Sequence, residues 1–270
     1  MGSTRRPRPP FAPALPPNRA DTVGSPASAA GWRVGVMGVC ERPEAKRSAI
    51  GRPYDPERLF LPPDDDLAPN RPGETLRARL DASRTGRAGL VLARLLGRRP
   101  VEDSWRRRLA AEQVVGAELE ELTAGGWEVV HSIVLPGGPA SAVISHLLIG
   151  PGGVFCVASE PTRRAHAEVG DSAVRVVGER HPRPCVRRAR HSAARASLAL
   201  SRGCGFLVRV LPVLVLVGPP SWEVAASLED VRVLGEREVA GLGALGGALH
   251  PHRVDRIHTV ARNRRVWLGA

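Results

Sequence analysis

The chain has 270 residues, a formal net charge of +12 and 43% hydrophobic residues, which is a normal globular balance. No apolar run reaches the roughly 18 residues that a membrane-spanning helix needs. Residues 1–10 are basic but lack the following apolar stretch of a secretory signal. We therefore expect a cytoplasmic protein without a membrane partner.

Almost all of the positive charge is arginine, because Lys46 is the only lysine in the chain. Such a surface attracts nucleic acid or another polyanion through phosphate contacts and counterion release. A composition rich in Ala, Arg, Gly and Pro and poor in lysine is also typical of a GC-rich genome. The charge alone therefore leaves a nucleic-acid partner open.

Two segments precede the expected folded domain. Residues 1–31 are rich in Pro, Arg, Ala and Ser and hold too few large apolar residues to fold, so we expect a disordered arm. Residues 32–100 are expected to be an irregular and partly helical basic connector, with a strand-like patch at 32–40 and a helical pattern at 73–97. The three aspartates at 64–66 lie between prolines, and a solvated loop explains them better than a metal site without spaced partners.

Residues 101–270 alternate between apolar runs and Pro/Gly-rich turns, as the sequence of one folded domain does. Leucine and valine recur at helical steps over 102–123, and a Gly-Gly pair then ends the expected helix. Strands expected at 127–135, 142–149 and 154–158 are separated by Pro/Gly turns, which favours an antiparallel meander. The later expected elements are a weak strand at 173–177, a helix at 184–201, a doubly buried strand at 208–217, a short strand at 231–234, and helices at 236–249 and 251–262. This order predicts an α/β fold with a mixed β-sheet flanked by helices.

Three blocks of residues resemble the nuclease-related domain (NERD) family. Residues 111–119, AEQVVGAEL, look like its opening helix, and residues 126–131, GWEVVH, resemble its first strand. The most specific block is residues 144–155, ISHLLIGPGGVF, which is similar to the family pattern I-D-H-L-V-I-G-P-x-G-V-F. Together with weaker matches in the later helix and strand, the resemblance covers roughly residues 105–262.

The resemblance implies a restriction-endonuclease-like core of the PD-(D/E)xK type. In those enzymes an aspartate on one strand and an acidic residue on the next bind Mg²⁺, and a lysine two residues further orients or activates the attacking water. A glutamate on a helix often completes the site. Mg²⁺ prefers carboxylate oxygens, and residues two apart on a strand share a face, which places the acidic ligand beside the lysine.

At these positions the sequence departs from the family pattern. The aspartate position is Ser145, the second acidic position is Ala158 and the lysine position is Glu160, while Glu112 on the first helix keeps its expected character. A serine hydroxyl is a poor Mg²⁺ ligand and alanine is none, and arginine cannot replace the lysine as a base because it stays protonated. The resemblance therefore predicts a vestigial site at these four positions, without a cofactor.

An alternative for the acidic residues stays open. Glu160 shares a strand face with the alanine position, so with Glu112, and with Asp171 or His146 as a further ligand, it could still hold Mg²⁺ in a divergent nuclease. His146 itself faces the opposite side of its strand, which favours a packed or hydrogen-bonded structural histidine. His250 and His252 could bind a metal as a pair. Without a third ligand, a solvated turn is favoured.

The expected helix at 184–201 carries arginines and no acidic residue. These arginines either contact phosphates or form a solvated helix face, and no aromatic side chains interleave them as in a platform that stacks single-stranded bases. The arginines on which a nucleic-acid contact would rest are Arg187, Arg188, Arg190, Arg195 and, at the end of the helix, Arg202.

Other kinds of site find no motif in the sequence. There is no G-x-x-x-x-G-K-[ST] loop, no G-x-G-x-x-G after a strand and no G-x-S-x-G elbow, so no small-molecule cofactor is expected. The four cysteines lack Cys-x-x-Cys spacing, so we expect free thiols rather than a zinc site. Three hypotheses remain: a non-catalytic NERD-like domain that retains nucleic-acid affinity, a divergent Mg²⁺ nuclease that uses Glu112 and Glu160, and a protein-interaction scaffold.

Overall fold

The computed structural model describes residues 61–83, 101–136, 142–162 and 165–269. All of these residues belong to one compact unit, Gly51–Ala270. Within them, no helix has the length and apolar character needed to cross a membrane. The expected arm at 1–31, the strand-like patch at 32–40 and the domain boundary at residue 100 lie outside the described residues and stay predictions.

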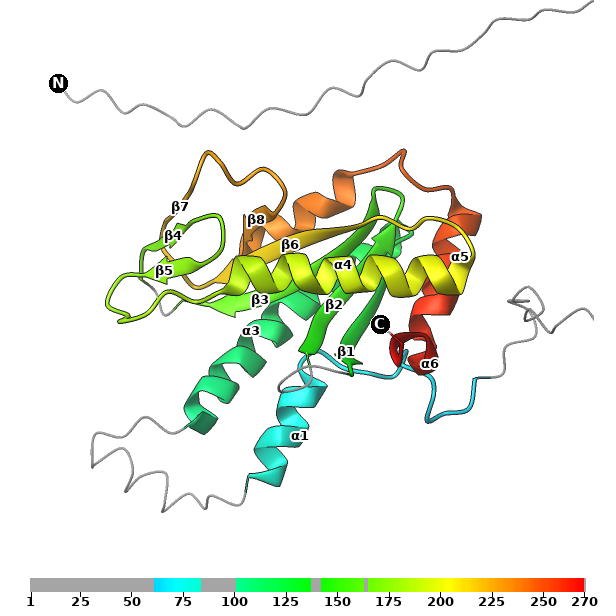
Figure 1. The fold of residues 1–270 in the computed structure, drawn as a ribbon, viewed down its shortest axis with the longest axis horizontal. Coiled ribbons are helices and arrows are strands. Elements are labelled where there is room, and N and C mark those ends of the chain that lie inside the picture. Colours follow the sequence, from blue (N-terminus) through cyan, green and yellow to red (C-terminus); the bar gives the residue numbers. More distant parts are fainter. Residues whose placement is uncertain (1–60, 84–100, 137–141, 163–164, 270) are drawn as a thin grey trace, which may run out of the picture. The chain divides into compact units, whose positions relative to one another are not determined.

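A five-stranded mixed sheet lies at the centre of this unit (Figure 1). β1 (Glu128–Leu135), β2 (Ala142–Gly150) and β3 (Gly153–Pro161) pair antiparallel in sequence order, as the Pro/Gly turns predict. β6 (Val210–Val217) lies parallel to β3, and β8 (Arg232–Gly235) lies parallel to β6. β6 is almost wholly apolar because both of its faces are covered.

Helices cover both faces of the sheet, which confirms the predicted α/β class. α3 (Val101–Glu121) and the 3₁₀ segment η3 (Glu236–Ala244) pack on one face and share a core with Phe155. α4 (Cys185–Cys204) and α5 (Pro251–Arg262) pack on the other face. Figure 1 shows α4 crossing the sheet on the side toward the viewer, with α3 behind the sheet.

The sequence of α4 explains how an arginine-rich helix can lie against a sheet. Its buried side is largely small residues at steps of three and four, which let the helix backbone approach the strands closely. The arginines fall on the remaining surface of the helix. The small residues buried along α4 are Ala189, Ala193, Ala196 and Ala199.

A second sheet of three short strands lies beside the first turn of α4. β4 (Ala167–Val169) pairs antiparallel with β5 (Val174–Val176) and parallel with β7 (Trp222–Val224). The expected strand at 173–177 corresponds to β5. β4 and β7 were not predicted, because three residues are too few to show alternation.

The later helical predictions need one correction. Residues 236–249 were expected to form a helix, but η3 ends at Ala244 and is 3₁₀ in character. Gly241 and Gly243 lie within it, and glycine is among the weakest α-helix formers. α5 has the predicted bounds, whereas the short α6 (Arg264–Trp267), which buries its tryptophan, was not predicted. The 3₁₀ segment η2 (Leu122–Gly125) continues α3 in place of the last expected helical turn.

The segment before α3 packs onto the domain more closely than a connector would. Leu67 is buried in the core beside β1, and Asp66 pairs with Arg262 of α5 at 2.5 Å. Asn70 donates its side-chain N–H to the His131 carbonyl of β1 at 3.2 Å. α1 (Glu74–Ala82) follows and covers part of α3. The expectation that aspartates 64–66 lie in a solvated loop fails for Asp65 and Asp66, which are largely buried and form ion pairs with Arg265 and Arg262.

Candidate functional site

The four positions singled out from the family pattern come together in one pocket of about 710 Å³, here called the α4 pocket. Glu112 comes from α3, Ser145 from β2, and Ala158 and Glu160 from β3. Strand alternation gives Ala158 and Glu160 the same face of β3, as expected. The N-terminal half of α4 forms the opposite wall. The sequence pattern therefore predicted which side chains meet here.

Glu112 is held in the α4 pocket by the residue that replaces the family aspartate. Its side chain is 5% exposed, and Ser145 Oγ donates a hydrogen bond to Glu112 Oε1 at 2.9 Å. Burial raises the pKa of Glu112, and the Ser145 hydrogen bond and the charge of Arg108 oppose this shift only in part. Burial that disfavours the ionised form of this carboxyl also weakens it as a metal ligand, because metals bind the ionised form.

Glu160 occupies the family's lysine position with the opposite charge and is only 6% exposed. Its Oε1 accepts a hydrogen bond from Arg183 Nη1 at 2.8 Å, and its Oε2 lies 3.3 Å from Arg188 Nη2. Both carboxylate oxygens therefore already have guanidinium partners. Releasing them to a metal ion would cost both contacts and leave Arg188 without this partner, although Arg183 would keep Glu179.

The donor set of the α4 pocket does not fit Mg²⁺. The ion prefers oxygen ligands in near-octahedral geometry, including at least one ionised carboxylate. Here Ala158 has only a methyl group, and the Ser145 hydroxyl donates its hydrogen bond to Glu112. Among the described residues, no group of three or more His, Cys, Asp or Glu side chains is placed to hold a metal ion. No hydrolytic step through a metal follows from this arrangement.

Cations surround the α4 pocket. Of the five arginines expected to contact nucleic acid, Arg187, Arg188 and Arg195 line the pocket, whereas Arg190 and Arg202 do not. Arg190 instead pairs with Asp230 through its Nε and Nη2 atoms, at 2.5 and 2.6 Å. Two further arginines, Arg79 of α1 and Arg108 of α3, also line the pocket. The sequence did not single these out, because nothing in it placed α1 or the first half of α3 beside α4.

On the other face of β2, His146 belongs to a closed hydrogen-bonded cluster, as its position on the strand predicts. Its Nδ1 lies 2.8 Å from His131 Nδ1 on β1, and its Nε2 lies 3.3 Å from Ser159 Oγ on β3. His131 Nε2 lies 3.3 Å from a carboxylate oxygen of Glu120, although without hydrogen-bond alignment. A donor on this Nε2 is favoured because it faces a carboxylate, so the His146 Nδ1–H donates to His131.

Burial keeps both histidines of this cluster neutral. It lowers the pKa of His131 to about 4. It also lowers the pKa of His146 well below the ordinary 6.5, and the neighbouring His131 adds to that shift. Because the cluster and the α4 pocket lie on opposite faces of β2, His146 is not placed to complete a metal site with Glu112 and Glu160.

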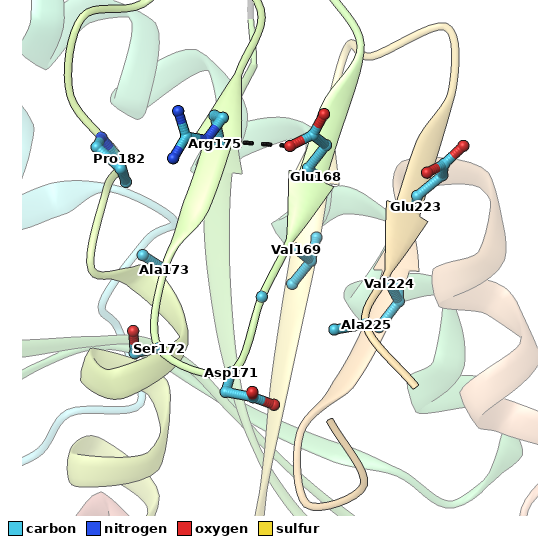
Figure 2. Close-up of a pocket in the computed structure, with 11 residues that line it drawn as sticks. Glu168, Val169, Asp171, Ser172, Ala173, Arg175, Pro182, Glu223, Val224 and Ala225 are labelled. Carbon is cyan, nitrogen blue, oxygen red and sulfur yellow. Dashed lines mark ion pairs between the residues drawn. The ribbon is translucent and has the colours of Figure 1, made fainter. Parts of the chain in front are cut away.

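A second hollow, of about 460 Å³, lies on the small sheet and contains none of the four family positions. Figure 2 shows Glu168, Glu223 and Arg175 projecting to the same side of the three strands, with Arg175 Nε 3.9 Å from Glu168. Asp171 lies at the turn between β4 and β5, where its carboxylate accepts a hydrogen bond from Ser227 at 2.8 Å. The proposed extra ligand Asp171 therefore lines this hollow and not the α4 pocket.

The remaining candidates are structural in character. His250 stands at the N-cap position of α5 without a side-chain cap hydrogen bond, and its ring stacks on that of His252 with centroids 5.8 Å apart. Among the described residues, Cys156, Cys185 and Cys204 are free and buried. Burial, followed by the charge of Glu160, raises the pKa of the Cys185 thiol to about 12, so it is unreactive near neutral pH.

The comparison with protein families agrees with the blocks of residues that resemble the family. Residues 107–217 match the model of the nuclease-related domain. The match begins in α3 and ends with β6, so it contains the α4 pocket residues Glu112, Ser145, Ala158 and Glu160. Comparison with curated proteins and with solved structures finds no match. The predicted resemblance is thereby confirmed for residues 107–217, while the activity of this part of the chain has to be argued from its pocket.

Proposed function

We propose that the nuclease-related domain is a pseudoenzyme that binds a polyanion, most simply nucleic acid, through the arginines of the α4 pocket, and that it does not hydrolyse the phosphodiester bond. The observation that carries the proposal is the pairing of Glu160 with Arg183 and Arg188 at the position of the family's lysine. An acid held by two arginines cannot supply the missing base, and no metal-ligating aspartate lies beside it.

The charge balance of the pocket supports anion binding. Five arginines line it, against two carboxylates, of which Glu160 is already neutralised and Glu112 has a raised pKa. In a metal-dependent nuclease the metal offsets the charge on the phosphate oxygens. Guanidinium groups can take over that role for binding, because they make bidentate hydrogen bonds to phosphate. They do not generate hydroxide, which is consistent with binding without hydrolysis.

Loss of catalysis is tested by incubating the purified full-length protein with plasmid and with linear DNA or RNA in Mg²⁺ and in Mn²⁺. We expect no cleavage above that of a mock purification from the same host. Cleavage that disappears in both Glu112→Ala and Glu160→Ala would overturn this half of the proposal and establish the divergent nuclease instead. Cleavage that survives both changes indicates a contaminating enzyme.

Polyanion binding is tested by salt titration of the affinity for short duplex and single-stranded oligonucleotides. Each phosphate that an arginine neutralises contributes about −0.9 to the slope of log K against log salt for duplex DNA. Arg187→Gln and Arg195→Gln should each make the slope shallower by about 1. Arg209→Gln is the matched control, since this exposed arginine does not line the pocket.

The outcome separates the proposal from the scaffold hypothesis. If the wild-type protein has no measurable affinity at low salt, or if Arg209→Gln weakens binding as much as the pocket variants do, the α4 pocket is not the polyanion site. A protein-interaction role for the domain would then be the better hypothesis.

A further inference from the structure

The Glu160 carboxylate lies where an external anion would be expected to bind in the α4 pocket. It is almost completely buried and contacts Arg183 and Arg188 with one oxygen each, at 2.8 and 3.3 Å. The two arginines differ in exposure: Arg183 is 24% exposed and Arg188 is 49% exposed. Arg183 is therefore the more buried of the two cations, and Arg188, which lines the α4 pocket, is the more exposed.

Arg183 does not depend on Glu160 for its position. Its Nε donates to Glu179 Oε2 at 2.7 Å, its Nη2 pairs with the other oxygen of the same carboxylate, and its Nη1 donates to the Pro161 carbonyl at 2.6 Å. These contacts hold the guanidinium in place from two sides. If the Glu160 charge were removed, these contacts would still hold Arg183 Nη1 at the place where it now meets Glu160 Oε1.

Helix α4 adds a second favourable element at the same place. It begins at Cys185 directly behind Glu160, it is 20 residues long, and its N-cap position, Pro184, has no side-chain cap. The positive end of its dipole is therefore not screened by a capping side chain, which favours a negative group here. Arg188 lies on the first turn of this helix and points its guanidinium at the same carboxylate.

We infer that Glu160 is an internal ligand of a phosphate site, formed by Arg183, Arg188 and the first turn of α4, and that it limits the affinity of this site for external phosphate groups. A carboxylate and a phosphate both present oxygens to guanidinium groups in the same bidentate way, so one can replace the other. The inference rests on the proposed function for the identity of the natural ligand. It adds that the pocket regulates its own affinity through this side chain.

The competition follows from the covalent link. A carboxylate fixed beside its partners acts at a high effective concentration, and an external phosphate must displace it and leave it buried without a cation. Wild-type protein should therefore bind inorganic phosphate weakly at this site. Removing the charge while keeping the side-chain shape should open the site.

The experiment measures binding of inorganic phosphate to the full-length protein by calorimetry and by the phosphate-dependent rise in the unfolding temperature. Glu160→Gln should bind phosphate about tenfold more tightly than wild type, because phosphate no longer has to displace a charged carboxylate from the two arginines. The matched control is Glu223→Gln, which makes the same change of charge on an exposed strand of the small sheet. It should leave phosphate affinity unchanged.

A second change locates the gain. Adding Arg188→Gln to Glu160→Gln should return phosphate affinity to the wild-type value. If folded Glu160→Gln binds phosphate no more tightly than wild type, or if Glu223→Gln gains as much, the inference is overturned.

Two further outcomes are decided in advance. If Glu160→Gln fails to fold, Glu160→Asp replaces it: this side chain keeps the charge but is too short to reach both arginines, so it should gain phosphate affinity by about threefold. Equality of Glu160→Asp with wild type would then count against the inference. If the wild-type protein does not bind nucleic acid but Glu160→Gln gains affinity for phosphate, the proposed function is refuted. The inference that Glu160 is an internal ligand is then still supported.

Discussion

Ser145 and His146 are neighbours on β2, yet they belong to two regions that accommodate buried polar groups in opposite ways. On the α4 side, Ser145 and the two glutamates lie in a pocket ringed with arginines, where charges are balanced by charges. On the α3 side, His146, His131 and Ser159 form a sealed cluster in which burial keeps both imidazoles uncharged.

The difference lies in what each region can exchange with solvent. Ion pairs at an open pocket can be replaced by an external ligand and depend on salt. A closed neutral network makes no such exchange, but it fails when one of its members takes up a proton. Ligands and salt should therefore act on the α4 pocket, and acid should act on the histidine cluster.

The largest expected effect contrasts the two neighbours directly. His146→Ala should lower the free energy of unfolding by about 3–4 kcal/mol, because it leaves a cavity in the core and orphans His131 and Ser159. Ser145→Ala should cost only about 1 kcal/mol, the value of one hydrogen bond. Urea denaturation of both variants at pH 7.5 measures this. If both variants lost the same free energy of unfolding, this difference between the two faces of β2 would be contradicted.

Acid should destabilise the domain through the histidine cluster. The folded-state pKa of His131, about 4, lies below the unfolded value of 6.5, so the folded state binds fewer protons in this interval. The stability that this depression contributes is present above pH 6.5 and is lost as pH falls toward 4, by about 3 kcal/mol for His131 alone. His146 adds to the loss in the same direction.

Unfolding free energies measured at steps between pH 7.5 and 4 test this, with His131→Gln as the comparison. The variant should show a shallower decline, although His258, whose pKa burial also lowers, still contributes. Asp66 and Asp230 have pKa values lowered from 3.8 by their arginine partners, so their contributions are lost only at still lower pH. A wild-type profile that is flat from pH 6.5 to 4 would contradict the neutral cluster.

The smallest expected effect lies in the α4 pocket and has the opposite sign. Because the folded-state pKa of Glu112 is raised, its ionised form opposes folding at neutral pH. Glu112→Gln keeps an acceptor for Ser145 Oγ and removes that charge, so it should stabilise the protein by on the order of 1 kcal/mol at pH 7. The advantage should shrink as pH falls through the raised folded-state pKa and should be lost below the unfolded value of 4.5. A variant less stable than wild type at pH 7 would indicate that Glu112 carries a favourable interaction of its ionised form.

The central strands and helices were predictable because local patterns decide them. The antiparallel meander follows from Pro/Gly turns between apolar runs, and β6 follows from its continuous apolar sequence. The three-residue strands β4 and β7 could not be predicted, since they are too short to show alternation and β7 pairs with β4, more than 50 residues earlier in the chain. The same holds for Leu67, a single apolar residue in a polar stretch whose burial depends on α5 and α6.

For the site, strand alternation sufficed to bring Ala158 and Glu160 together, and the family pattern added Glu112 and Ser145. The partners of Glu160 were not predictable in full: Arg183 precedes the expected helix and was not singled out, and Arg190 was expected at phosphates but is paired with Asp230. Such pairings depend on side-chain directions at the ends of α4 and β8, which a single sequence does not encode locally.

The packing of residues 61–82 and of α5 and α6 against β1 bears on where this domain can be cut. The matched stretch, residues 107–217, stops short of Ile257 and Trp267 and begins after Leu67, all of which are buried in the same core as β1. A fragment trimmed to the matched stretch would leave the outer edge of β1 and its apolar face uncovered, the kind of surface through which chains associate into aggregates. Fragments meant to report on this pocket should therefore run from before Leu61 to the end of the chain.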